Sequence, residues 1–317
     1  MTAVSRYTQD MIDAYVEAGY WSPHSTSYFW DRNSVTRPDR PALADGHVAF
    51  TWASGVAAVD AIAAGLIDAG VPRDGVLLVQ GANSAILVLF RLACEKAGII
   101  PAFLYVGSRR SEIEAVSRKL NPVGAVIAAD GKTDLLSVYR SLGLARNLQF
   151  LFTLEPNAFG IPSITDLSER HVVVDFGARC IRPYEMTGIV SSSGTTGPPK
   201  CIEYSCWPRL ASSRVYIERL RITENDVILT CIPFYTGGGD MQFHISPQIG
   251  VKFVVLSKFT PEETCRLIER EAVTGAAMVP TMIARINGLP NLAEYDLSSL
   301  RWVVSGGGML PYDVGAR

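Results

Sequence analysis

Short apolar runs alternate with longer amphipathic stretches along the first half of the chain. Runs of this kind, bounded by turn residues, are typical of buried strands, and they occur at 76–80, 99–105, 123–129 and 148–154. Between them lie helical patterns, the clearest at 84–98 and 111–120. Because strands that alternate with helices build mostly parallel sheets covered by helices, this half of the chain is predicted to form an α/β unit.

A second series of the same kind follows. Residues 157–184 are irregular and rich in Pro, Gly and charge, which is typical of a connection. Beyond it, strand patterns occur at 227–232, 252–257, 275–280 and 300–308, and helical patterns at 207–221 and 260–273. The predicted organisation is therefore two α/β subdomains, 1–184 and 185–317, with no short internal repeat.

Two helix starts carry capping signals. Thr260 precedes Pro261 and Glu263, which predicts a helix that begins at the proline. Ser111 and Glu114 stand at capping-box spacing, which predicts a helix start at the serine.

Composition narrows the possible functions. The chain has 317 residues, 48% of them hydrophobic, so it can bury a large core. With 29 Lys and Arg against 31 Asp and Glu, and no basic stripe, it is not expected to bind nucleic acid. The first residues lack a signal-like apolar core, and the most apolar region, 76–106, is interrupted by polar residues, so no membrane span is predicted. Six scattered cysteines indicate reduced thiols in a cytoplasmic protein rather than a zinc site.

Residues 189–205, IVSSSGTTGPPKCIEYS, form the most distinctive segment. A triphosphate needs hydrogen-bond donors and a balancing positive charge. Backbone amides made accessible by glycine, together with hydroxyls and one lysine, provide both. The spacing is not that of a Walker P-loop, because two prolines separate Gly197 from Lys200 and a cysteine follows the lysine. A cluster of this composition can also be an ordinary surface turn.

The residues from Ser193 to Lys200 resemble the phosphate-binding signature of the adenylate-forming superfamily, which includes acyl-CoA synthetases, firefly luciferase and the adenylation domains of peptide synthetases. Five other segments resemble that superfamily in the same order along the chain: 37–52, 81–105, 232–239, 279–286 and 296–311. The resemblance implies a partial N-terminal domain of the acyl-CoA synthetase fold, with two stacked α/β subdomains layered α-β-α-β-α.

The resemblance also implies an activity. Superfamily members join a carboxylic acid to ATP, giving an acyl-adenylate and pyrophosphate, and then pass the acyl group to a nucleophile, most often coenzyme A. By resemblance, the catalytic residues are Lys200 and Thr196, with Thr196 near Mg²⁺. The nucleotide-binding residues implied by resemblance are Ser193, Gly194, Thr195, Thr196, Gly197, Lys200, Gly306, Gly307 and Gly308.

The acyl pocket is implied by the segment 232–239. Its candidate residues are Phe234, Tyr235, Thr236 and Gly238. Relatives commonly have a histidine where this chain has Thr236, so a ring-gated pocket is in doubt. His244 could replace that ring, although ordinary packing is the expected role.

The end of the sequence departs from the superfamily pattern. Relatives continue to a Tyr-Gly-x-Thr-Glu element, a ribose-binding aspartate and a small domain with a catalytic lysine, none of which occurs before Arg317. The chain is therefore expected to be most of an N-terminal domain, whether as a partial product or as a natural short form. Two alternatives to an acid–CoA ligase stay open. One is a carrier-loading adenylation module, in which Asp240 would bind an amino group, and the other is an inactive nucleotide-binding chain.

Overall fold

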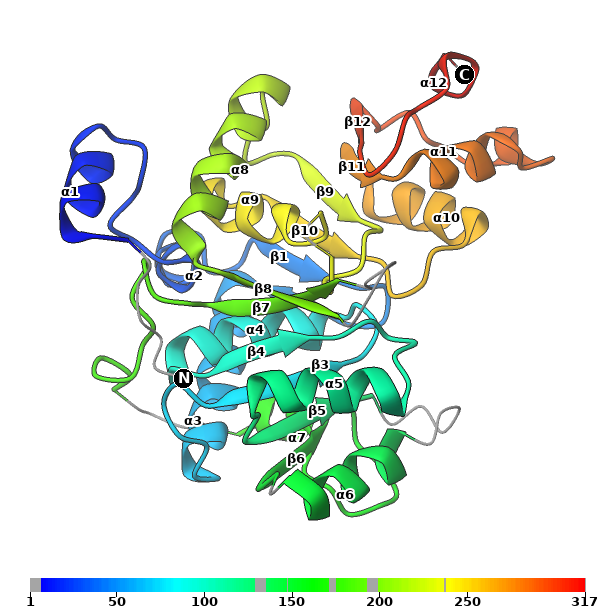
Figure 1. Ribbon diagram of the computed structural model, residues 1–317. Helices are drawn as coiled ribbons and strands as arrows, with labels where there is room; N and C mark the ends of the chain where they lie inside the picture. Colours follow the sequence, from blue (N-terminus) through cyan, green and yellow to red (C-terminus); the bar gives the residue numbers. More distant parts are fainter. Residues whose placement is uncertain are drawn as a thin grey trace.

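The computed structural model describes residues 7–128, 135–146, 148–170, 175–192, 199–236 and 238–316. Twelve strands in these ranges form two six-stranded sheets (Figure 1). The first sheet has the strand order β6-β5-β3-β4-β7-β8, and the second has the order β12-β11-β9-β10-β1-β2. Both are parallel except for one antiparallel edge strand each, β8 beside β7 and β2 beside β1. The predicted α/β class with mostly parallel sheets is confirmed.

The strand bounds follow the apolar runs closely. The first sheet contains β3 (Val76–Gln80), β4 (Ile100–Phe103), β5 (Gly124–Ile127), β6 (Phe150–Thr153), β7 (Gly188–Ser192) and β8 (Lys200–Tyr204). The second contains β1 (Pro41–Ala44), β2 (Ala49–Thr51), β9 (Val227–Thr230), β10 (Lys252–Val255), β11 (Gly275–Met278) and β12 (Trp302–Ser305). All residues of β3, β4, β5 and β11 are buried, as expected for parallel strands covered on both faces.

The two sheets are not formed by two continuous halves of the chain. The strands β1 and β2 precede the whole first sheet in sequence, yet they pair with β10 in the second sheet. The strands β7 and β8 lie beyond the predicted division at residue 184, yet β7 pairs with β4 in the first sheet. The chain therefore passes between the sheets more than once, and both strands that flank residues 193–198 belong to the first sheet.

Helices occupy the layers between and outside the sheets. Their bounds are α1 (Gln9–Glu17), α2 (Thr26–Thr36), α3 (Trp52–Asp68), α4 (Ala85–Ala97), α5 (Arg110–Leu120), α6 (Leu135–Arg146), α7 (Ile164–Ser168), α8 (Cys206–Leu220), α9 (Met241–Ile249), α10 (Pro261–Glu271), α11 (Pro280–Asn287) and α12 (Tyr312–Gly315), with a short 3₁₀ turn at Leu292–Glu294.

Three apolar clusters show how these layers pack. The largest cluster joins α3 and α4 to both sheets, with Leu77 of β3 on one side and Phe253 of β10 on the other. A second cluster packs α5 and α6 on the outer face of the first sheet, and a third packs α10 and α11 on the outer face of the second. The order of layers is therefore α-β-α-β-α, as the resemblance implied.

Local signals predicted some helix starts and not others. The side chain of Thr260 accepts a hydrogen bond from Glu263 N at 3.2 Å, and α10 begins at Pro261 as predicted. The Ser111 prediction is wrong, because α5 begins at Arg110 and Glu112 Oε2 accepts from Arg109 N at 2.7 Å. The connection predicted to be irregular contains the short helix α7. No helix of the described residues is long and apolar enough to cross a membrane.

Candidate functional site

The carboxyl ends of parallel strands are where ligands bind in open α/β sheets, and the glycines after β12 lie at such an end. An added Cβ at Gly306 would meet no atom within 4 Å, so open space lies beside this backbone. Gly307 has a φ of +79°, which a residue with a side chain rarely adopts. At Gly308 an added Cβ would only touch Pro280, at 3.8 Å. A flat ligand can therefore approach this strand end closely.

The predicted phosphate loop lies mostly outside the described residues, because Ser193, Gly194, Thr195, Thr196 and Gly197 all fall in the gap 193–198. The two ends of the loop are described.

Ser192 pairs with Lys200 across the antiparallel β7–β8 ladder, so both ends lie at one edge of the first sheet. Lys200 is exposed, and in the described part of the chain it makes no ion pair. Its charge is available to a ligand.

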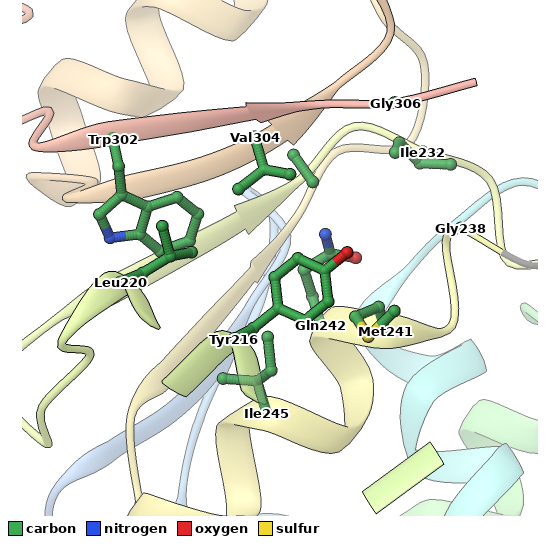
Figure 2. Close-up of a pocket in the computed structure, with 11 residues that line it drawn as sticks. Tyr216, Leu220, Ile232, Gly238, Met241, Gln242, Ile245, Trp302, Val304 and Gly306 are labelled. Carbon is green, nitrogen blue, oxygen red and sulfur yellow. The ribbon is translucent and has the colours of Figure 1, made fainter. Parts of the chain in front are cut away.

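A pocket of about 100 Å³ lies along β12 (Figure 2). Trp302, Val304 and Gly306 form one wall, because alternate residues of a strand point to the same face. The remaining lining residues come from α8, the start of α9 and neighbouring segments: Tyr216, Leu220, Ile232, Gly238, Met241, Gln242, Ile245 and Ala277. Since a strand rises about 3.3 Å per residue, the backbone from Gly306 to Trp302 spans about 13 Å. The pocket thus begins beside the open glycine and ends at an indole ring.

Of the four predicted pocket residues, Gly238 lines this pocket. Phe234 is only 2% exposed and belongs to the large core cluster, where its ring faces that of Phe253. Tyr235 packs edge-on against Tyr105, with ring centroids 5.2 Å apart. Thr236 closes a turn, since its hydroxyl donates to Pro233 O at 2.7 Å and accepts from Gly239 N at 3.2 Å. These three side chains therefore do not line the pocket; they stabilise the backbone beside it.

Nine of the eleven lining residues were not identified from the sequence, and three of those nine carry polar groups: Tyr216, Gln242 and Trp302. Trp302 shares the period of two with Val304 and Gly306, a signal that was available in the sequence. Gln242 shares α9 with a second glutamine, Gln248, and the sequence does not distinguish the two. Gly275 seats the indole, because an added Cβ there would lie 2.0 Å from Trp302 Cζ2.

The other side of α9 carries a buried cluster of charges. Asp240 is fully buried and forms an ion pair with Arg91 of α4, and a second with Arg209 Nε of α8 at 3.1 Å. His244 Nε2 lies 3.5 Å from the Asp240 carboxylate, and its Nδ1 lies 3.0 Å from Thr26 Oγ1. His244 therefore takes part in internal packing.

The protonation states follow from burial and charge. Burial by itself would raise the pKa of Asp240, but the attraction of Arg91, with help from His244 and Arg209, outweighs it and holds that pKa below its usual value. Burial lowers the pKa of His244 despite the nearby carboxylate, so its imidazole is held neutral. The Asp240 carboxylate is thus ionised and already compensated by two guanidinium groups.

A larger hollow of about 780 Å³ lies elsewhere, between α3, the β1–β2 turn and residues 155–170. Asp45, Glu169 and Arg170 are among the residues that line it. It contains none of the predicted site residues, whereas the small pocket reaches both Gly238 and Gly306. The small pocket is therefore the candidate site.

Comparison with known proteins gives matches over nearly the whole chain. The family described as "AMP-binding enzyme" matches residues 30–317. The medium-chain fatty-acid–CoA ligase of Escherichia coli (strain K12) is 25% identical over 99% of the chain, which covers 56% of that ligase. The 4-coumarate–CoA ligase CCL1 of Humulus lupulus is 26% identical over 85% of the chain and half of that protein (50%).

A solved structure shows the same fold. The apo structure of Mycobacterium smegmatis MbtA has a TM-score of 0.83 and 22% identity, and covers 98% of this chain and 57% of that chain. The chain thus spans about half the length of these relatives. On the match to residues 30–317, the chain belongs to the family of AMP-binding enzymes.

Proposed function

We propose that the protein activates a carboxylic acid with ATP and transfers the acyl group to coenzyme A. In the first step the carboxylate oxygen attacks the α-phosphorus of ATP, and pyrophosphate leaves. In the second step the thiol of coenzyme A attacks the acyl carbonyl, loses its proton, and AMP leaves. Positioning and charge stabilisation account for most of the catalysis in such phosphoryl chemistry.

The roles of the site residues are part of this proposal. Lys200 and Thr196, with Ser193, Gly194, Thr195 and Gly197, would hold the phosphates of ATP and its Mg²⁺. The adenine would lie against Gly306, Gly307 and Gly308. The open space beside Gly306 fits a flat ring, and the exposed Lys200, which makes no ion pair with the described residues, fits an anion.

One observation carries the proposal: the pocket that begins beside Gly306 continues as an apolar slot along β12. An acid in this slot would present its carboxylate at the mouth, where the nucleotide is expected, and would bury the rest of the molecule. The ligase relatives support coenzyme A as the acceptor, by analogy of family. A cytoplasmic location and a role in fatty acid metabolism stay predictions.

The carrier-loading alternative depended on Asp240 as the partner of a substrate amino group. In the structure Asp240 is 0% exposed, is paired with two arginines and does not line the pocket. An amino group would have to displace a buried guanidinium to reach it, so this observation favours the ligase.

The test is pyrophosphate exchange into ATP across a panel of carboxylic acids, followed by thioester formation when coenzyme A is added. Exchange that depends on one class of acid is the expected result. Absence of exchange with every acid would contradict the proposal. Exchange without transfer to coenzyme A would refute only the second step.

Lys200→Ala should weaken the use of MgATP by about 1–3 kcal/mol, because one charge-assisted contact to phosphate is lost. The measurement is the dependence of exchange rate on ATP concentration. Lys119→Ala is a matched control, since Lys119 is also an exposed lysine near β8. Its charge acts on the pKa of the Cys201 thiol in that strand. Equal losses in both variants would show that general positive charge, and not the loop lysine, matters.

A further inference from the structure

Two residues that line the pocket each have a buried polar atom without a hydrogen-bond partner among the described residues: Gln242 Oε1, and Trp302 Nε1, which is turned away from the pocket (Figure 2). Gln242 is 5% exposed, and its Oε1 has no hydrogen-bond partner among the described residues. The residue lies in the first turn of α9, and Figure 2 shows its amide end and the hydroxyl end of Tyr216 pointing into the pocket. Because a buried acceptor without a donor is costly, its partner is expected to come from outside the chain.

The surroundings of this amide are apolar. The same pocket is lined by the apolar side chains of Leu220, Ile232, Met241, Ile245 and Val304. A buried apolar surface with a few inward-facing polar groups, here the amide of Gln242 and the hydroxyl of Tyr216, is the usual form of a small-molecule site, in which the polar groups fix the orientation of the ligand.

The volume sets the size of the ligand. The pocket has about 100 Å³ and opens beside Gly306, against the roughly 150 Å³ of a closed apolar cavity that holds a benzene ring, so it can bury a short chain or most of a single ring. Figure 2 shows the six-membered ring of Trp302 at the far end, with its Nε1 turned away from the pocket. Gly275 leaves no space for a side chain behind the indole, so the ring is held in place. A long acyl chain would have to displace it.

We infer that the acid activated by this protein is compact, with a short chain or a single ring, and carries a hydroxyl or amino group that donates a hydrogen bond to Gln242. This inference rests on the proposed function, because it assigns the substrate of that site. Trp302 sets the length limit and Gln242 selects the substituent. A hydroxyl suits either orientation of the amide, since it both donates and accepts.

The experiment compares matched acids on the whole protein that carries these residues. The pairs are benzoate with 3-hydroxybenzoate and butanoate with 4-hydroxybutanoate, and decanoate tests length. Binding of each acid is measured by calorimetry without ATP, and pyrophosphate exchange is measured separately. At least one hydroxy acid should bind about ten-fold or more tightly than its unsubstituted partner, because the unsubstituted acid leaves the amide unpaired. Decanoate should bind weakest.

Gln242→Leu should abolish the preference within the pair by weakening the hydroxy acid and sparing the unsubstituted acid. Gln149→Leu makes the same chemical change at an exposed position before β6 and should leave the preference unchanged. A thermal melt of each variant separates lost recognition from lost folding. Gln242→Leu should melt no lower than the wild type, whereas a purely structural amide would give a lower melting temperature and an unchanged preference.

The outcomes separate this inference from the proposed function. Equal binding of paired acids, strongest binding of decanoate, or an unchanged preference in Gln242→Leu would overturn the inference, even where exchange proves that the protein adenylates acids. Selective binding that requires Gln242, without any exchange, would keep the inference about the ligand and overturn the proposed reaction.

Discussion

The two sides of helix α9 treat polar groups in opposite ways. On one side, Asp240 and His244 are one turn apart and face Arg91 and Arg209, so every buried charge has an opposite charge nearby. On the other side, Gln242 faces an apolar pocket, and its carbonyl oxygen has no partner in the described part of the structure. Both sides are buried, yet only one is internally compensated.

This difference separates buried polar groups that stabilise the fold from those that are positioned to bind a ligand. Arg91 comes from α4, Arg209 from α8 and Thr26 from α2, so the compensated cluster ties α9 to three other helices. The Gln242 amide points into a pocket and links α9 to no other described element. Mutations on the two sides should therefore change stability in opposite directions.

Asp240→Asn should give the largest effect. Removal of the carboxylate charge leaves the buried Arg91 and the partly exposed Arg209 without their counter-charge, which should lower the free energy of unfolding by about 3–5 kcal/mol. Urea denaturation followed by circular dichroism measures it. Glu224→Gln is the matched control, because Glu224 also faces two arginines, Arg37 at 3.3 Å and Arg40 at 3.5 Å, but is half exposed. Its loss should stay below about 1 kcal/mol. Similar losses in the two variants would mean that the buried charge cluster stabilises the fold no more than an exposed one does.

Gln242→Leu should have the opposite sign. Replacement of an unpartnered buried amide by an apolar side chain of similar size removes a desolvation cost, so the free energy of unfolding should rise by about 1–2 kcal/mol. Urea denaturation again measures the change, and Gln149→Leu should stay within about 0.5 kcal/mol of the wild type. A clear loss of stability in Gln242→Leu would mean that the amide has an internal partner and that both sides of α9 serve the fold.

The smallest effect concerns pH. The pKa of His244 is lowered in the folded protein, mainly by burial, so below about pH 6.5 the unfolded chain takes up a proton that the folded chain does not. Stability contributed by the neutral ring is therefore complete above that pH and is lost as the pH falls. His244→Asn should flatten the dependence of unfolding free energy on pH between 7 and 5.

His47 provides the control for this measurement. It is exposed in the turn between β1 and β2, away from the charge cluster. His47→Asn should retain the wild-type slope, and an equal slope in His244→Asn would mean that His244 is protonated in the folded protein.

Local sequence patterns predicted helices and strands well, because burial and capping hydrogen bonds involve residues that are close in the sequence. The buried strand β3 coincides with the apolar run 76–80, and α4 follows its cap Ser84, whose side chain accepts from Leu87 N at 3.1 Å. The same holds for Thr260 at the start of α10. At α5 the backbone amide of Arg109 donates to Glu112 Oε2, so the helix begins one residue before the predicted Ser111.

The candidate site could be predicted only in part. Gly306, the first of the three glycines after β12, and Gly238 are found at the pocket, since glycine is the residue that leaves space for a ligand at a strand end. Phe234 was expected to line the pocket, but an aromatic side chain can face either side of its backbone, and here it faces the core. Tyr216 comes from a different helix, and no local pattern indicates that it faces β12.

By itself, the sequence determined the α/β class, the positions of most strands and the family, because hydrophobic periodicity and the segment from Ser193 to Lys200 are properties of neighbouring residues. The tertiary structure alone decided that β1 and β2 join the second sheet and that β7 and β8 join the first. It also decided that Asp240 meets Arg91 while Gln242 meets no partner among the described residues. These facts depend on which distant surfaces pack together, and strand pairing and charge compensation are set by contacts that no local stretch contains.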